Sequence, residues 1–497
     1  YNALASNTTA SNNTAVGYDA LLLNTTGTGL VAVGTNALDA NTTASNNVGI
    51  GLNAAGGTTT GADNIAIGTN SLLQNTTGAS NVSIGTYALN ANTTASNNTA
   101  VGHQSLTANT TGAEGVAVGM SALAANTTGN YGVAVGAYAL DANTEGDNNI
   151  AIGRSALGAN TTGDSNTVVG TFALDANTTA NSNTAVGYAA LTANTTGADN
   201  TAVGTSALGA NTTAASNTAV GVSSMAANTT GQYNTAVGTR ALNANTTASF
   251  TVAVGYEALK LNTTGAGNVG IGQSALYTNT TGANNTAVGY GALDANTTAA
   301  NNVAVGYNAL GANTTGAQNT AVGQNSLPVN TTGAQNTAVG VNALVLNTEG
   351  SYNVSLGNYA GQTITTGDGC VSLGYNANPS SATVDNEFTL GSSSITSLRC
   401  NDTTISSLSD SRDKTDVIDS PYGLGFINTV RPVQFKWESR DGNGKDGWTR
   451  VGFIAQELLV ACDGNNAVLD LVSEENPEKL EAKYGNLLPI AIQAIQD

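Results

Sequence analysis

The sequence predicts an all-β protein in which a parallel β-solenoid (β-roll) of 17-residue coils is followed by a small α+β domain. First, a unit of the form N-T-A-V-G-x-x-A-L-x-A-N-T-T-G-x-x repeats without insertion or deletion from near Tyr1 to about residue 375. Second, only 9% of the residues are charged and 5% are aromatic. Third, ten of the 13 Lys and Arg residues follow position 398. A unit of constant length is typical of coils that stack directly on one another.

These changes along the chain divide it into three predicted segments. Residues 1–375 should form the solenoid, residues 376–408 a connector of short β strands, and residues 409–497 the α+β domain. The glycine of the V-G step recurs from Gly17 at every seventeenth residue as far as Gly374, which makes 22 glycines. We number each coil from this glycine, so that the preceding residue is position −1 and the fourth residue after it is position +4.

Each coil should contain one short strand just before its glycine. The triplets at 31–33 (VAV) and 65–67 (IAI) alternate in size, so positions −3 and −1 share one face of the strand. We expect this apolar face to point inward. Leu occupies position +4 in 18 of the 22 coils and should form a second inward column. The glycine should form a bend that a side chain would obstruct.

Asparagine marks two further positions of the coil. It occupies position +7 in 19 of the 22 coils, for example Asn24 and Asn41, and recurs at position −4, for example Asn47. Asn tolerates left-handed backbone and hydrogen-bonds along a stack. We therefore expect both positions to be turns that form amide ladders.

A single coil cannot fold alone. Ordering its backbone costs about 17 to 34 kcal/mol of conformational entropy. One Leu and two Val or Ile side chains contribute only about 1.5 to 3 kcal/mol each when buried. Stacking must supply the rest. Because so short a coil encloses little interior, we also expect neighbouring chains to complete the apolar columns around a threefold axis.

Composition argues against several classes of function. A net charge of −19, with three cations in the first 398 residues, disfavours nucleic-acid binding. No stretch approaches the roughly 20 apolar residues of a membrane span, so we expect no membrane insertion. We expect no cofactor. The three cysteines, Cys370, Cys400 and Cys462, are too few and too scattered for a disulfide framework or a zinc site, and we interpret them as free thiols.

No metal site is expected either. The segment Asp441–Asp446 has the spacing of a calcium loop only in part, because Lys445 stands at a ligand position and no Glu follows at the required distance. A hairpin turn is favoured at this segment.

The repeat N-[TV]-A-[VI]-G followed by A-L resembles the head repeat of trimeric autotransporter adhesins. The resemblance implies a left-handed parallel β-roll in which three chains wrap together. The present unit is longer than that of the family and contains an additional N-T-T-G.

Three motifs follow in the last hundred residues: L-S-D-S-R-D-K at 408–414, V-R-P-V-Q-F-K-W at 430–437 and V-G-F-I-A-Q-E at 451–457. An apolar segment, L-L-P-I-A-I-Q-A-I-Q, follows at 487–496 and reads as the start of a longer helix of a trimeric coiled coil. In order and spacing these resemble the C-terminal intramolecular chaperone of phage tailspikes and tail fibres, the S74 peptidase family typified by endosialidase. The resemblance covers about residues 405–497.

This resemblance implies trimer assembly followed by self-cleavage. Carried over to the matching positions, the bond cut is Leu408–Ser409, with Ser409 as the nucleophile and Lys414 as the general base. Asp410 and Arg412 would support them. A lysine accepts a proton only if burial or a cationic neighbour such as Arg412 lowers its pKa. Trimer packing could supply that burial.

From the spacing alone, a second interpretation of this motif stays open. Ser409 or Asp410 can cap the start of a helix, with the basic residues only solvated. The resemblance, not the spacing, favours a single-turnover serine endopeptidase with a Ser-Lys dyad.

The function predicted from these observations is structural. We expect a viral tail fibre or spike in the virion, outside the cell, that attaches to a host-surface glycan or protein and is assembled as a homotrimer by residues 409–497. The 17 Asn-Thr-Thr sequences at position +7 would be bare in a phage protein and could carry sugar in a eukaryotic secretory pathway or an algal virus.

Three alternatives remain. A polysaccharide-degrading tailspike needs paired carboxylates about 5 to 9.5 Å apart, and stacking should place Asp141 and Asp175 near one column, two coils apart. A secreted or cell-surface filament or adhesin is the second. The third is an ice-binding or surface-adsorbing face made by the regular Thr columns.

Overall fold

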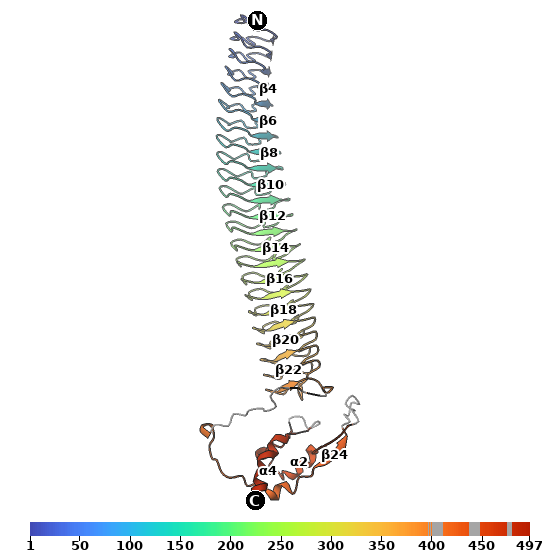
Figure 1. Cartoon of the computed structure of the whole chain (residues 1–497). Coiled ribbons are helices and arrows are strands. Elements are labelled where there is room, and N and C mark those ends of the chain that lie inside the picture. The colour runs from blue at the N-terminus through green and yellow to red at the C-terminus, as the bar shows by residue number, and fades with distance from the viewer. Residues whose placement is uncertain (396, 398, 400–410, 437–447, 475–479) are drawn as a thin grey trace. The chain divides into compact units, whose positions relative to one another are not determined.

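The computed structural model describes the whole chain except residues 396, 398, 400–410, 437–447 and 475–479. The chain divides into two compact units, Tyr1–Asn308 and Ala309–Asp497. Stacked coils make up the first unit, and the second contains further coils and a small α+β domain (Figure 1). The predicted fold class, a parallel β-solenoid with 17-residue turns followed by an α+β region, is confirmed.

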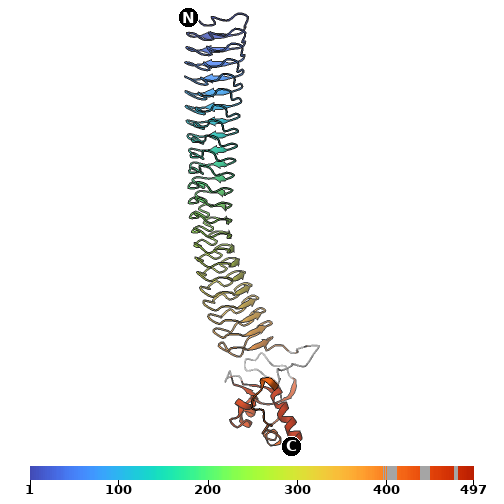
Figure 2. The same cartoon turned by 90° about the vertical axis from the view of Figure 1, so that its left-hand side faces the viewer.

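Each coil contributes one three-residue strand to the stack. Neighbouring strands pair in parallel at an offset of one coil, so that Thr14 lies beside Val31 and Val31 beside Val48. This pairing runs from β1 to β18 in the first unit and from β19 to β23 in the second. Figure 2 shows the same stacked strands from a second direction.

The strands of the first unit are β1 (Thr14–Val16), β2 (Val31–Val33), β3 (Val48–Ile50), β4 (Ile65–Ile67), β5 (Val82–Ile84), β6 (Thr99–Val101), β7 (Val116–Val118), β8 (Val133–Val135), β9 (Ile150–Ile152), β10 (Thr167–Val169), β11 (Thr184–Val186), β12 (Thr201–Val203), β13 (Thr218–Val220), β14 (Thr235–Val237), β15 (Val252–Val254), β16 (Val269–Ile271), β17 (Thr286–Val288) and β18 (Val303–Val305). Those of the coils in the second unit are β19 (Thr320–Val322), β20 (Thr337–Val339), β21 (Val354–Leu356), β22 (Val371–Leu373) and β23 (Phe388–Leu390).

Strand β23 lies beyond the point where the repeat was expected to stop. It pairs with β22 in the same register, with Phe388 beside Val371, and Gly391 follows Gly374 at the usual interval of one coil. The stacking therefore continues past residue 375, although the Asn-Thr-Thr part of the motif has been lost there.

The turns of the coil depend on left-handed backbone at fixed positions. The repeat glycine has positive φ throughout, for example +136° at Gly136, where a Cβ would lie 2.5 Å from the carbonyl oxygen of Gly153 in the next coil. The predicted need for glycine at this bend is confirmed. Unexpectedly, Leu at position +4 is also left-handed, with φ of 50° at Leu38. Its side chain is fully buried, and that burial offsets the cost of an unfavourable conformation.

The strand faces are the reverse of the prediction. The small residue at position −2 is buried, as Ala32 and Ala66 show with 0% exposure, whereas Val33 at position −1 is 36% exposed. The interior is narrow because the Leu of position +4 fills it: a Cβ added to Gly49 at position −2 would lie 3.0 Å from Leu38 Cγ. Small side chains therefore occupy position −2 in every coil of the first unit except that of β10, where Val168 is buried, and the β-branched residues of positions −3 and −1 face outward.

The amide ladders form as predicted, but without left-handed backbone at the Asn residues. Asn41 Nδ2 donates to Asn24 Oδ1 at 2.9 Å and to the carbonyl of Ala44 at 3.1 Å. In the second ladder, the backbone N–H of Asn64 donates to Asn47 Oδ1 at 2.8 Å. These side chains are buried, so the ladders satisfy polar groups that water does not reach. The positive φ values lie at other positions of the coil.

The α+β domain contains short elements around one apolar core. Its helices are η1 (Ser411–Asp413), α1 (Leu424–Ile427), α2 (Ala455–Ala461), α3 (Asn466–Leu469), η2 (Tyr484–Asn486) and α4 (Leu487–Gln496). Two antiparallel pairs complete it, β24 (Val433–Lys436) with β25 (Thr449–Gly452), and β26 (Val472–Ser473) with β27 (Glu481–Ala482).

The helix predicted near the C-terminal end of the sequence is present as α4. The loop Asp441–Asp446 lies outside the described residues, but the strands on either side of it pair as a hairpin would require. Among the described residues, no helix has the length and apolar character needed to cross a membrane.

Candidate functional site

The predicted processing site lies at the start of the α+β domain. Leu408, Ser409 and Asp410 are outside the described residues, so the structure does not place the nucleophile or the bond that it would attack. Arg412, in η1, and Lys414 are described and are both exposed. The backbone N–H of Lys414 donates to the carbonyl of Ser411 at 3.4 Å, which closes the turn that carries both basic residues.

The exposure of Lys414 bears on the role predicted for it. A lysine becomes a general base only when its charged form is destabilised, and desolvation is the usual cause. Described residues 411–420 are all exposed apart from Asp413, whose side chain is not described. The described part of one chain therefore does not bury Lys414.

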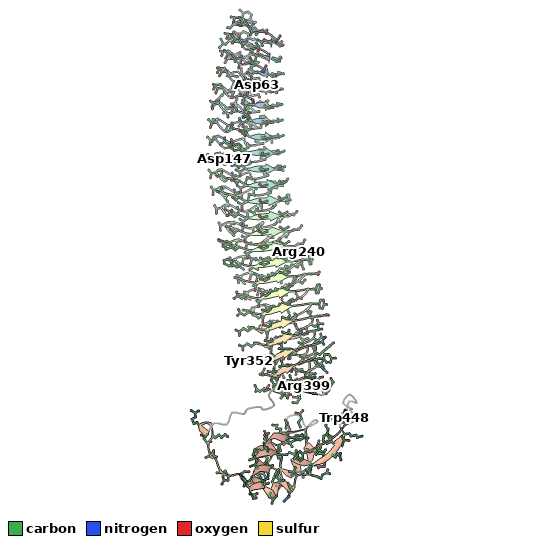
Figure 3. The ribbon with its side chains drawn as sticks, viewed as in Figure 1. Asp63, Asp147, Arg240, Tyr352, Arg399 and Trp448 are labelled. Carbon is green, nitrogen blue, oxygen red and sulfur yellow. The ribbon has the colours of Figure 1, made fainter. Side chains whose placement is uncertain are left out.

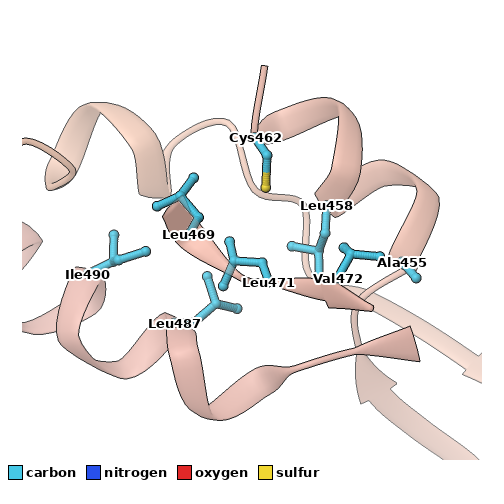
Figure 4. Close-up of a cluster of buried hydrophobic side chains, with 8 residues drawn as sticks. All are labelled: Ala455, Leu458, Cys462, Leu469, Leu471, Val472, Leu487 and Ile490. Carbon is cyan, nitrogen blue, oxygen red and sulfur yellow. The ribbon is translucent and has the colours of Figure 1, made fainter. Parts of the chain in front are cut away.

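One apolar cluster holds the α+β domain together. Leu471 is fully buried and lies among side chains from α2, α3, β26 and α4 (Figure 4). The buried members are Ala455, Leu458, Cys462, Leu469, Leu471, Val472, Leu487 and Ile490. Residues from both α2 and α4 contribute, so the segment at 487–496 belongs to the same folding unit as the motif at 451–457.

An ion pair joins two of the sequence motifs. Arg431 Nε donates to Glu457 Oε2 at 2.9 Å, and a second guanidinium nitrogen donates to the other carboxylate oxygen. The hydrogen bonds from Arg431 lower the pKa of the Glu457 carboxyl. Both groups are exposed, so the pair positions the segment before β24 against α2 more than it stabilises the fold. The motif spacing gave no sign of this pairing.

The glycine of the V-G-F-I-A-Q-E motif permits a close approach. A Cβ on Gly452 would lie 2.8 Å from the hydroxyl oxygen of Tyr484. The same hydroxyl accepts a hydrogen bond from the backbone N–H of Phe453 at 3.2 Å, and the two rings meet edge to face with centroids 5.5 Å apart. Gly452 and Phe453 thus seat η2 against β25.

An apolar cleft of about 310 Å³ opens beside these contacts. It is lined by Ile427, Val430, Pro432, Phe453, Tyr484, Leu487, Leu488 and Ala491. On α4, the side chains of Leu488, Ile492 and Ile495 are 64%, 49% and 84% exposed. Their spacing of four and then three residues is that of a coiled-coil seam. This helix therefore buries one side in its own domain and leaves an apolar stripe uncovered.

Two carboxylates of the solenoid approach each other as the repeat predicted. Asp141 and Asp175 occupy position +5 two coils apart, and a Cβ on the intervening Gly158 would lie 3.4 Å and 2.9 Å from their respective Oδ1 atoms. Gly158 has no side chain to separate the two carboxylates, so they face each other across its coil. Burial raises the pKa of both carboxyls, and the charge of Asp175 raises the pKa of Asp141 further.

Two cations of the solenoid share one carboxylate. Glu257 accepts from Lys260 Nζ at 2.8 Å and from Arg240 at 3.3 Å, and Lys260 also donates to the hydroxyl of Tyr277 at 3.2 Å. Figure 3 places Arg240 beside the strand column and Asp147 at the opposite edge of the coils. Within the described residues, no three His, Cys, Asp or Glu side chains are grouped to hold a metal ion.

The cysteines contribute no pairing in the described part of the chain. Cys370 and Cys462 are free and buried, and burial raises the pKa of both thiols. Cys400 lies outside the described residues.

Comparison with known proteins identifies the C-terminal region. The family model for Peptidase S74, described as the chaperone of endosialidase, matches residues 409–467. No curated protein and no solved structure matches the chain. The match includes the first three motifs but not α4, and it begins at the residue predicted to follow the cleaved bond. The chain therefore carries β-solenoid repeats followed by a C-terminal Peptidase S74 chaperone-of-endosialidase domain.

Proposed function

We propose that this protein is a viral tail fibre or spike, located in the virion, whose solenoid projects toward a receptor on the host surface. The observation that carries the proposal is the combination of a long solenoid with the Peptidase S74 match at residues 409–467. The S74 resemblance supports a trimer, with the C-terminal domain acting as an intramolecular chaperone during assembly. A host glycan or surface protein is the proposed partner.

The need for such a chaperone follows from the repeat. Coils of equal length and nearly equal sequence present almost the same surface at every step. Three chains that meet one coil out of register would lose little contact at each coil, so incorrect registers compete with the correct one. A C-terminal domain of unique sequence that trimerises first sets a single register. The uncovered stripe of Leu488, Ile492 and Ile495 on α4 supplies an apolar surface for that step.

The proposed maturation step removes the chaperone. The Ser409 hydroxyl oxygen attacks the carbonyl carbon of Leu408 while Lys414 accepts its proton. The bond between Leu408 and the Ser409 nitrogen breaks as an ester forms, and the nitrogen takes up the proton. Water then hydrolyses the ester, which leaves one product ending at Leu408 and one beginning with Ser409. Because Lys414 is exposed in the single chain, its burial by a neighbouring chain would make cleavage follow assembly.

Mass spectrometry of the purified full chain tests this maturation directly. The expected product ends at Leu408, and it should be absent from the Ser409→Ala and Lys414→Met variants. Ser411→Ala is the matched control, since it removes a neighbouring serine hydroxyl and should still be cleaved. Cleavage that survives Ser409→Ala would overturn the assignment of the nucleophile.

A polysaccharide-degrading spike is the second candidate, and the geometry of Asp141 and Asp175 supports it. Both carboxylates approach the same glycine of the intervening coil, which makes them neighbours on the scale of glycosidase carboxylate pairs, about 5 to 9.5 Å. The raised pKa of Asp141 would suit a general acid. Incubation with host polysaccharide should release new reducing ends if this candidate is correct, and Asp141→Asn together with Asp175→Asn should abolish them.

A further inference from the structure

One exposed position of the solenoid is apolar in every coil of the first unit. Position −1 is Val or Ile in every coil of the first unit, and its side chain is exposed or half-buried in each. The neighbouring position −3, on the same face, holds only Val, Ile or Thr. We call the residues of positions −3 and −1 in strands β1 to β18 the apolar strand face.

Two other positions of the same coils that are not buried accept charged side chains. Position +2 holds Asp19, Arg240 and Glu257, and position +9, otherwise Thr, holds Glu145. The many copies of one unit within a single chain therefore act as a comparison of sequences. Water would accept a charged residue at position −1 as readily as at position +9. The absence of any there indicates that position −1 is covered in the assembled protein.

The side chains of position −1 also form one continuous surface. Parallel pairing places Val118 beside Val135 and Val135 beside Ile152, and the same register holds from β1 to β18. Adjacent strands are about 4.8 Å apart, so these side chains touch along the column. Single exposed apolar residues are ordinary, but a contiguous apolar patch of this extent marks an interaction surface.

We propose that the apolar strand face is the surface by which three parallel copies of this chain meet, with each coil beside the same coil of its neighbours. This inference rests on the proposed trimeric fibre and specifies which face of it is internal. A partner that covers the column at every coil must repeat with the same spacing, and another copy of this chain has that property.

Size and charge agree with this occupant. A standard stable interface involves about 20 to 30 residues on each side, and the apolar strand face offers two residues from each strand of β1 to β18. It carries no charged residue, as the centre of an interface usually does not. A parallel arrangement, unlike an antiparallel one, also brings the S74 domains of all chains to the same end.

Cysteine cross-linking in the full chain tests the inference. Val135→Cys places a thiol on the apolar strand face, and Thr128→Cys places one at the exposed position +9 of the preceding coil. With a short bis-maleimide, Val135→Cys should give linked dimers, with one chain of each trimer left unlinked. Thr128→Cys should match the background of the unsubstituted chain, which contains the three native cysteines. Equal linking at both positions, or none at residue 135 in a protein that sediments as a trimer, would overturn the inference.

A second experiment removes the surface chemically. Val118→Glu, Val135→Glu and Ile152→Glu together should lower the sedimenting mass from three chains to one. The matched control is Thr111→Glu, Thr128→Glu and Thr162→Glu, which extends the column that already contains Glu145 and should leave the trimer intact. A trimer that survives the first set contradicts the inference alone. If the unsubstituted chain is itself a monomer, the proposed trimeric fibre fails as well.

Discussion

The solenoid coils and the C-terminal α+β domain solve the problem of stability in opposite ways. In the solenoid, most coils bury one Leu and a few Ala side chains, and their amides and carbonyls bond to the next coil. In the α+β domain, eight buried side chains, the first Ala455 and the last Ile490, meet in a single cluster with no repetition. Stability in the solenoid therefore accumulates between neighbours, whereas in the domain it depends on one core.

The difference has a functional consequence. A stack of similar coils has no unique contact that would tell one chain where to begin pairing with another. The α+β domain has a unique sequence, a unique core and an uncovered apolar stripe on α4. Under the proposed function, the region that is poor at specifying register is joined to a region of unique sequence that would specify it during assembly.

The largest effect of a single substitution should fall in the domain. Leu471→Ala removes a fully buried side chain from the centre of its cluster and should cost about 4 kcal/mol. Because there is one core, hydrogen exchange should accelerate throughout the described helices α2, α3 and α4 together. Exchange confined to residues next to Leu471 would contradict the contrast drawn between the two regions.

A glycine substitution in the solenoid should be nearly as costly but local. Gly136→Ala forces a side chain onto backbone with φ of +136° and against the carbonyl of Gly153, at a cost of about 3 kcal/mol. Exchange should rise in the coils on either side and return to normal further away. Gly209→Ala is the control, because Ala124 and Ala226 already occupy the same position, and it should change little.

Interrupting an amide ladder should have an intermediate effect. Asn160 Nδ2 donates to Asn143 Oδ1 at 2.8 Å, and Asn160 Oδ1 accepts from Asn177 at 2.9 Å. Asn160→Ala leaves buried partners unpaired and should cost about 2 kcal/mol in thermal or denaturant unfolding. Asn160→Thr should cost less, since Thr58 fills the equivalent position and accepts from Asn75 at 3.4 Å. Equal losses of stability in the two variants would indicate that the hydrogen bonds of the amide ladder do not cause the loss.

The smallest effect concerns the paired carboxylates. Burial and the nearby Asp175 raise the pKa of Asp141, so the folded protein holds this proton more tightly than the unfolded chain does. The contribution of Asp141 to the free energy of unfolding therefore falls as the pH rises from the ordinary pKa of 3.8 through the raised pKa. This contribution stays lower at neutral pH. Asp141→Asn should raise the stability at pH 7 by about 0.5 kcal/mol.

Unfolding midpoints of Asp141→Asn and of the unsubstituted chain, measured at pH 7 and below pH 3.8, check the direction of this effect. The advantage of Asp141→Asn over the unsubstituted chain should shrink below pH 3.8, where the carboxyl is protonated in both states. Asp63→Asn, at a less buried position, is a control that should show a smaller difference at either pH. An Asp141→Asn protein that is less stable than the unsubstituted chain at neutral pH would contradict this prediction.

The repeat made most of the solenoid predictable. A glycine at a constant interval fixes the coil length, and the recurrence of Asn explains the ladders that include Asn24 and Asn41. The orientation of the strand was not predictable from alternation alone, because both faces are apolar. The useful signal was that position −2 is almost always small, which indicates a confined interior. The strand at Phe388–Leu390 could have been found from its place one coil after the preceding strand.

Other features of the structure could not be predicted from local sequence preferences. Leu rarely adopts left-handed backbone, so its positive φ at position +4 follows only from the stacked coils, which reward its burial. In the α+β domain, motif order predicted the family to which residues 409–467 match, but not the pairing of Arg431 with Glu457. The roles of Ser409 and Lys414 remain predictions, since the nucleophile lies outside the described residues.

Sedimentation equilibrium of two forms of the chain tests the central claim most directly. The uncleavable Ser409→Ala protein should have three times the mass of the 49.2 kDa chain. A chain ending at Leu408, made without the α+β domain, should form aggregates or assemblies of mixed mass. A monomeric Ser409→Ala protein, or a soluble and uniform trimer formed without residues 409–497, would contradict the account of a solenoid assembled by its C-terminal chaperone.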